Sequence, residues 1–337
     1  MNKLKNAALV HRIQWVDIAK GIAMLFVIIG HTAPFGSMER SFIFSFHMPL
    51  FFLLSGYTMK FADSWEAAGR KVIKRAYQLL LPVFIIAVVS VFLSYHNALH
   101  RDVATLMGIA RNMALAVLWG SGIPFKYHPG LGMCWFLISL FWADVILNGI
   151  HLLFSKKPVM RTFFIIILSG IGIALGKHGV WLPQNFDVTL CCILFLYVGV
   201  LWRTYDYVLS EYNNAIFVAG AVFWGLCLFL GKYIELASRH YPGAVWCVIE
   251  AIAAVYVICL IGKKFEFRIC LNRIFAFIGV NTLSIFEIHA LDWYVKPFWN
   301  SANWKVASLK RLCIVLSITL LLLLAKYAWR KAMVRRS

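Results

Sequence analysis

The sequence predicts an all-α protein that crosses a membrane many times. Hydrophobic residues fill 62% of its 337 positions and charged residues only 14%, which is more apolar surface than a soluble core of this size can bury. The apolar residues come in runs of about twenty, the length of helix that spans the hydrocarbon layer. Strict apolar–polar alternation is missing, which argues against an outer-membrane barrel.

About ten runs are long enough to be spanning helices. They cover residues 16–34, 42–60, 77–95, 132–154, 162–180, 187–203, 214–231, 243–262, 274–292 and 311–329. The segment 96–131 is too long for a simple loop, so it is expected to lie in the interface or to re-enter the bundle. No soluble appendage or linker is seen, and residues 1–337 are expected to form one membrane-embedded domain.

The charge distribution indicates an orientation rather than a nucleic-acid partner. The net charge is +19, but the basic residues lie in short segments between apolar runs, as the positive-inside rule produces. With ten spans and a cytoplasmic N-terminus, cytoplasmic Lys and Arg outnumber outer ones two to one, so both termini are expected in the cytoplasm. The eight cysteines lie in or beside apolar runs without metal-ligand spacing, so neither a metal site nor a disulfide framework is expected.

The first apolar run carries three ionisable residues, Asp17, Lys20 and His31, and such groups at membrane depth are functional candidates. Asp17 and Lys20 share a helix face and can pair; alternatively, Lys20 extends to the cytoplasmic surface and Asp17 neutralises it. His31 follows Lys20 by eleven residues, about 16 Å along the axis and about three turns, so both side chains point to the same side. A purely structural histidine is the alternative for His31.

The second run continues the pattern. It holds His47 and Pro49 in its first half and Ser55 and Tyr57 towards its cytoplasmic end. Pro49 removes a backbone hydrogen bond and is expected to kink the helix. The connection between the two helices is short, so His31 and His47 are expected on adjacent antiparallel helices, both towards the outer half of the membrane.

A basic cluster precedes the third helix, with Arg70, Lys71, Lys74 and Arg75 at helical spacing. Topology and lipid headgroups are one explanation for it. Together with Lys20, the cluster would also make a phosphate cradle that opens into the bundle.

Five segments together resemble the acyltransferase 3 family of integral membrane acyltransferases, which have about ten helices. They are WVDIAKGIAMLFVIIGH, FSFHMPLFFLLSGYTM, KRAYQLLLP, CWFLISLFW and IGVNTLSIFEIH. The resemblance runs from Arg12 to about His289 and is most specific in the first two helices. Among the members, the chain looks like the short ones, such as the fucose 4-O-acetylase-like proteins and the enterobacterial-common-antigen O-acetyltransferase.

This resemblance implies an O-acyltransferase of the bacterial inner membrane. It implies a cytoplasmic acyl-CoA donor, usually acetyl-CoA, and an acceptor hydroxyl on a surface carbohydrate or its lipid-linked precursor. The family's signature of a basic residue, ten residues and a histidine falls on Lys20 and His31. Many members carry arginine at the first position, and lysine cannot make the same bidentate contact. No metal is implied, and the oligomeric state and the membrane face of the acceptor stay open.

The resemblance and the spacing together assign residues to the binding of the acyl-CoA donor. Lys20, Lys74 and Arg75 would hold the phosphates of coenzyme A, which leaves the thioester near His31. His31 would act as the base that deprotonates the hydroxyl, since its reference pKa near 6.5 suits neutral pH; a covalent acyl-histidine is the other possibility. Ser55 and Tyr57 either line the donor channel or merely pack.

The remaining candidates belong to the acceptor side and to the orientation of His31. Glu39, in the outer turn, is the nearest acid that could orient His31; otherwise it is a solvated loop charge. His47, Glu287 and His289 are expected to line the acceptor side, with His289 matching the family's late histidine. For Asp144 and Glu250, which also lie in apolar runs, only polar pairing within the bundle is expected.

Two rival functions remain at this point. A transporter or flippase for a glycan precursor would also line its path with buried charges, although the paired repeats of many transporters are not seen. An acyltransferase for a lipid or another small molecule that is not a glycan would share the same chemistry.

Overall fold

The computed structural model describes residues 13–265 and 269–336, and within these residues it contains helices and no β-strand. The α-helices are α1 (Gln14–Gly30), α2 (Met38–Tyr57), α3 (Trp65–His96), α4 (Val103–Trp119), α5 (Trp135–Leu153), α6 (Pro158–Lys177), α7 (Phe186–Glu211), α8 (Asn213–Phe229), α9 (Val245–Phe265), α10 (Ile269–Val280), α11 (Thr282–Leu291), α12 (Lys296–Trp299) and α13 (Trp304–Arg336). Three short 3₁₀ helices join them: η1 (Gly132–Cys134), η2 (Pro183–Asn185) and η3 (Asp292–Val295). The all-α prediction is confirmed.

Six helices in the described residues are long and apolar enough to cross a membrane, which supports a multi-pass membrane protein. They are α3, α6, α9, α13, α5 extended by η1, and α7 extended by η2. The expected spans 16–34, 42–60 and 214–231 correspond to α1, α2 and α8, which are not among the six. Helices α1 and α8 have 17 residues each, about 25 Å of helix against a core of about 30 Å.

The spanning helix predicted over 274–292 is broken in the structure. The chain bends by 69° between the segments 272–280 and 282–299, which count as a seventh crossing only if taken together. Asn281 lies at the break with φ −104° and ψ 16°, outside helical geometry. The bend turns α11 towards α1, which it contacts.

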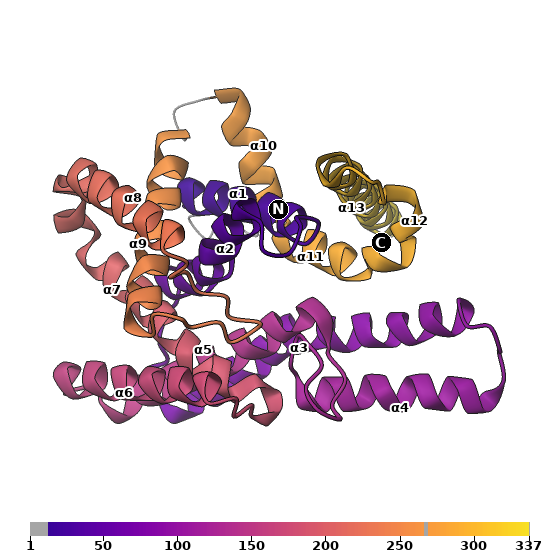
Figure 1. Ribbon diagram of the computed structural model, residues 1–337, viewed down its shortest axis with the longest axis horizontal. Helices are drawn as coiled ribbons and strands as arrows, with labels where there is room; N and C mark the ends of the chain where they lie inside the picture. The colour runs from indigo at the N-terminus through magenta and orange to yellow at the C-terminus, as the bar shows by residue number, and fades with distance from the viewer. Residues whose placement is uncertain (1–12, 266–268, 337) are drawn as a thin grey trace.

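Helices α1 and α2 form the centre of the molecule (Figure 1), with α1 against α10 and α9 and α2 against α7. Glycines allow the backbones to approach closely at both main contacts. A Cβ on Gly279 would lie 1.7 Å from the backbone oxygen of Asp17, and one on Gly56 would lie 1.9 Å from that of Leu196. Small residues at such contacts are typical of helix packing in membranes.

The segment 96–131 contains α4, which packs against α3 as a helical hairpin. Figure 1 shows the hairpin projecting from the rest of the bundle. Helix α3 begins at Trp65, well before the predicted span 77–95. The basic cluster therefore lies in the first three turns of this helix. Those turns place the cluster beside Asp144 of α5.

Candidate functional site

Three adjoining cavities run along one side of α1, from Lys20 to His31. The basic cavity, of about 300 Å³, is lined by Lys20, Ser55, Thr58, Met59, Lys60, Lys71, Arg75, Asp144 and Leu196. The middle cavity, of about 360 Å³, is lined by Lys20, Met24, Val27, Met48, Phe51, Ser55, Arg75, Gln78, Leu79, Phe136, Leu137, Leu140, Thr282, Leu283 and Phe286. The histidine cavity, of about 30 Å³, is lined by Val27, His31, Phe44, His47, Met48, Met133, Trp135, Glu235, Leu236, Ala237 and Phe286.

Neighbouring cavities share walls. Lys20, Ser55 and Arg75 line both the basic and the middle cavity. Val27, Met48 and Phe286 line both the middle and the histidine cavity. A long, narrow ligand could therefore extend from the cations at one end to the histidines at the other.

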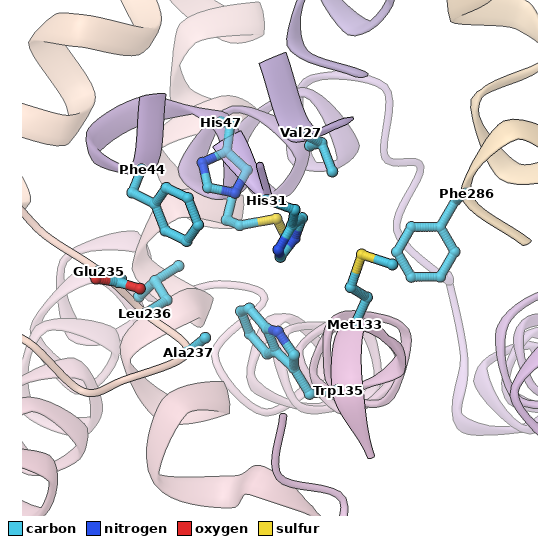
Figure 2. A pocket seen from close by; sticks show the side chains of 11 residues that line it. Val27, His31, Phe44, His47, Met133, Trp135, Glu235, Leu236, Ala237 and Phe286 are labelled. Atoms are coloured by element: carbon cyan, nitrogen blue, oxygen red, sulfur yellow. The ribbon is translucent and has the colours of Figure 1, made fainter. Parts of the chain in front are cut away.

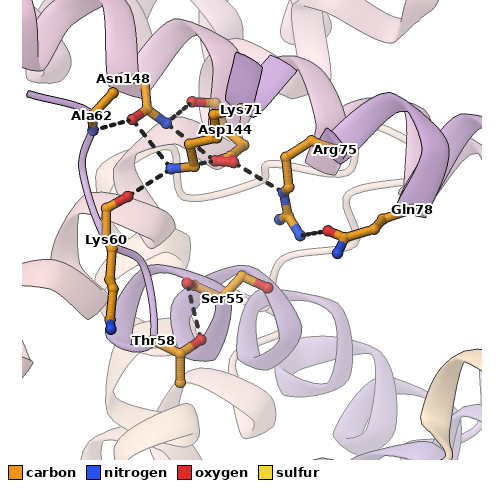
Figure 3. Close-up of polar contacts among 9 residues, drawn as sticks. All are labelled: Ser55, Thr58, Lys60, Ala62, Lys71, Arg75, Gln78, Asp144 and Asn148. Atoms are coloured by element: carbon orange, nitrogen blue, oxygen red, sulfur yellow. Dashed lines mark hydrogen bonds and ion pairs between the residues drawn. The ribbon is translucent and has the colours of Figure 1, made fainter. Parts of the chain in front are cut away.

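Asp144 of α5 organises the basic cavity (Figure 3). Its side chain is 5% exposed and pairs with Arg75 Nε at 3.0 Å and with Lys71 Nζ at 3.4 Å. Lys71 also donates to the backbone oxygen of Lys60 at 2.8 Å and to Asn148 Oδ1 at 3.2 Å. Three acceptors thus surround the three hydrogens of the Lys71 ammonium group, and the polar pairing expected for Asp144 is present.

Arg75 keeps donors for a ligand. Its Nε bonds to Asp144, and its Nη1 reaches Gln78 Oε1 at 3.4 Å. A guanidinium has five N–H groups in a planar fork, so several remain at the wall shared by the basic and middle cavities. Lys74, in contrast, is exposed and lies outside the lining of the three cavities. Of the basic cluster on α3, therefore, Lys71 and Arg75 line the basic cavity, because they lie on the helix face that contacts Asp144.

The charges of the basic cavity favour an anion. Lys20, Lys60, Lys71 and Arg75 line it, against one carboxylate, that of Asp144. A cluster of this kind suits phosphate groups. The middle cavity is mostly apolar beyond its shared wall, which suits an uncharged, extended arm.

Three side chains dominate the histidine cavity: His31, His47 and Trp135 (Figure 2). His31 is the residue that ends α1, and its ring is exposed within the cavity. His47 is buried, and its Nδ1 lies 2.8 Å from the backbone oxygen of Ile43. Since a carbonyl only accepts, Nδ1 carries the proton and Nε2 is the acceptor of the neutral ring. The predicted adjacency of the two histidines is thus found.

The turn between α1 and α2 is fixed by two local contacts. The Ser37 hydroxyl accepts the backbone N–H of Arg40 at 3.2 Å, which caps the start of α2. Arg40 Nη1 donates to the backbone oxygen of Gly30 at 3.1 Å, which satisfies a carbonyl at the end of α1. These bonds hold His31 against the first turns of α2.

Glu235 enters the histidine cavity from the connection between α8 and α9. Its Oε1 lies 3.4 Å from Arg40 Nη2, and the guanidinium of Arg40 stacks on the Phe44 ring at 3.9 Å. The connection is anchored by Arg239, whose buried Nε donates to Asp187 Oδ2 at 2.9 Å. Sequence reasoning missed Glu235, because it belongs to no motif and reaches the site only through the tertiary fold.

His289 of α11 lies beside His31, with the two ring centroids 5.5 Å apart. Its Nδ1 is 2.7 Å from Asp292 Oδ2, and Arg311 of α13 binds Asp292 through Nε and Nη2, each at 2.7 Å. Sequence reasoning named His289 but missed Asp292 and Arg311. In the sequence, the only indication that His289 and Asp292 could pair is their spacing of three residues.

Other predicted residues lie away from the cavity linings. Glu39 is exposed in the first turn of α2. Tyr57 is buried against Trp15, and its hydroxyl donates to Asp206 at 3.0 Å, so it belongs to a separate aromatic cluster. Glu287 is half-buried on α11, and Glu250 is fully buried in α9. Among the candidates for the donor side, Lys20, Ser55 and Arg75 are the ones that the structure brings together.

The convergence of three histidines does not amount to a metal centre in the part of the chain that the structure describes. There, no group of three His, Cys, Asp or Glu residues is arranged to hold a metal ion.

Comparison with known proteins identifies one family. A family model described as an acyltransferase domain matches residues 13–328, which include the linings of all three cavities and the Asp292–Arg311 pair. Neither the curated proteins nor the solved structures gave a match.

Proposed function

Since the chain belongs to the acyltransferase 3 family, we propose that this membrane acyltransferase moves an acetyl group from acetyl-CoA to a hydroxyl of a cell-surface carbohydrate or its lipid-linked precursor. The observation that carries the proposal is the series of three cavities with shared walls between the basic cluster and His31.

The shape of coenzyme A matches this series. Its phosphates fit the basic cavity, where Lys20 and Arg75 face the middle cavity as well. Its uncharged pantetheine arm fits the apolar middle cavity. The thioester then reaches His31, about 16 Å from Lys20 along α1. Positive charge around the basic cavity favours the cytoplasmic face for this end, where acyl-CoA is found.

The transfer at His31 needs no proton donor or acceptor besides the imidazole, the hydroxyl and the thiolate. The acceptor hydroxyl attacks the thioester carbonyl as His31 takes its proton. A new C–O bond forms, the C–S bond breaks, and the departing thiolate recovers the proton from the imidazolium. His31 ends the cycle neutral, and the products are an ester and free coenzyme A. A covalent acyl-histidine would use the same ring and yield the same products.

The acceptor end favours a large acceptor over a small molecule. The histidine cavity holds about 30 Å³, room for one or two waters and therefore for little more than the reacting hydroxyl. The body of the acceptor would stay outside, next to the partly exposed Glu235 at the wall of the cavity. A partly exposed carboxylate at this end suits a sugar, because it accepts hydrogen bonds from sugar hydroxyls. The acceptor would approach from the membrane face opposite the basic cavity.

The test is complementation of a deletion strain with the wild-type protein or with His31→Ala, followed by measurement of base-labile acetate on purified surface glycans. We expect no acetate with His31→Ala, and normal acetate with His178→Ala, a matched control at the exposed end of α6. Wild-type acetylation by His31→Ala would overturn the assignment of His31. Loss of glycan export, with no transfer from labelled acetyl-CoA in membranes, would favour the transporter instead.

A further inference from the structure

A catalytic histidine needs a partner on its second ring nitrogen, because that partner decides which nitrogen carries the proton. Glu39, the acid nearest to His31 in sequence, is exposed in the first turn of α2. The fold instead brings His289 next to the His31 ring, at a centroid distance of 5.5 Å and an interplanar angle of 55°.

The proton on His289 can be assigned from its partner. His289 is completely buried, and its Nδ1 lies 2.7 Å from Asp292 Oδ2. A carboxylate only accepts, so Nδ1 carries the proton and the neutral ring presents a lone pair at Nε2. Nε2 is buried and has no hydrogen-bond partner among the described residues. A buried acceptor without a donor is rare in folded proteins and calls for an explanation.

His31 can supply the missing donor. His31 is an exposed residue that lines the histidine cavity. At the observed separation of the rings, a ring N–H of His31 that points at His289 Nε2 would lie within hydrogen-bond distance of it. Catalytic hydrogen bonds are often long in unliganded sites and tighten when the substrate binds.

Arg311 keeps Asp292 in place and balances its charge. It binds both carboxylate oxygens of Asp292 at 2.7 Å. The charge of the carboxylate is thereby matched, so it does not require an imidazolium as its counterion. Arg311 also reaches Thr32 Oγ1 at 3.3 Å, and Thr32 follows His31 in the chain. These contacts link the end of α1 to α11, η3 and α13 in one closed network of side chains.

We propose that His289, held by Asp292, is the positioning residue for His31. His289 Nε2 accepts the N–H of one His31 nitrogen, which leaves the other His31 nitrogen unprotonated and facing the acceptor hydroxyl. When His31 takes the hydroxyl proton, it becomes an imidazolium that still donates to His289, and it returns the proton to the departing thiolate. This inference rests on the proposed acyl transfer and adds the residues that direct it.

Chemical rescue tests the proposal. Membranes that contain the native glycan acceptor are supplied with labelled acetyl-CoA, and base-labile label in the glycan is followed. His289→Gly should lower kcat by a factor of about 100 or more, with the KM for acetyl-CoA unchanged. Imidazole should restore at least tenfold, because it can donate to Asp292 and accept from His31. 1-Methylimidazole, which has no N–H for Asp292, should not. Equal rescue by both, or none by imidazole in folded protein, would overturn the proposal.

A second pair of variants covers the case in which His289→Gly does not fold. His289→Gln keeps an amide that can donate to Asp292 and accept from His31, whereas His289→Leu keeps the volume without the polar atoms. We expect Gln to retain at least tenfold more kcat than Leu at equal protein levels. Equal kcat for the two would overturn the role of His289. If His31→Ala is inactive while His289→Leu is fully active, this inference fails and the proposed function stands.

Discussion

Arg75 and Lys74 are adjacent cations that the fold separates, and replacing each by alanine tests the proposed coenzyme A site directly. Arg75 lines the basic and middle cavities, while Lys74 is exposed outside their linings. In Arg75→Ala, Asp144 keeps its contacts with Lys71 and Asn148, so the helix pair α3–α5 should stay folded. The variant therefore removes phosphate donors without leaving a buried carboxylate unpaired.

The size of the effect follows from the lost bonds. A hydrogen bond to a charged group contributes about 1.5 to 3 kcal/mol, which corresponds to a loss of affinity of roughly 10- to 150-fold. We expect a loss of this size for coenzyme A with Arg75→Ala, a partial loss with Arg75→Lys, and less than a twofold change with Lys74→Ala.

The measurement is binding of coenzyme A to the purified protein in detergent, by titration calorimetry, because KM equals a dissociation constant only when chemistry is slow. Thermal unfolding of each variant controls for folding. Equal weakening by Lys74→Ala and Arg75→Ala would refute the reasoning, since it would mean that net charge near the membrane, rather than the cavity wall, decides the affinity.

Three further predictions concern other parts of the molecule. Lys20→Ala should weaken the use of acetyl-CoA chiefly through KM, with Lys20→Arg tolerated, as kinetics in membranes would show; wild-type KM for Lys20→Ala would contradict this. Glu235→Gln should lower transfer to glycan with an unchanged KM for acetyl-CoA; a raised KM would assign Glu235 to the donor. Gly56→Ala should lower the stability by about 1 to 3 kcal/mol, because the added Cβ meets the backbone of Leu196, whereas Gly225→Ala, in open space on α8, should not; thermal unfolding compares the two.

The interval between Lys20 and His31 illustrates what local geometry can predict. Eleven residues on one helix fix both a distance and a direction, and both residues do line the same series of cavities. The basic cluster was also recognisable, but not which of its members face inward. That choice depends on Asp144, which lies on a different helix and selects one face of α3.

The partner of His31 shows the limit of such reasoning. Glu39 was the natural candidate because it is close in sequence, yet the ring beside His31 belongs to His289. The break at Asn281 turns α11 towards α1, and no apolar pattern over 274–292 indicated it. Thr32 and Arg311, which close the same network, are 279 positions apart.

The sequence by itself determined the membrane class, the helical architecture and the family, because composition, run length and short motifs are local properties of a chain. It also determined the Lys20–His31 interval, since one helix fixes that geometry. The tertiary structure decided which cations form the basic cavity, that Glu235 reaches the histidine cavity, and that His289, Asp292 and Arg311 gather around His31. Those choices depend on helix packing and on one bend, where residues far apart in the chain satisfy each other's buried charges and hydrogen bonds.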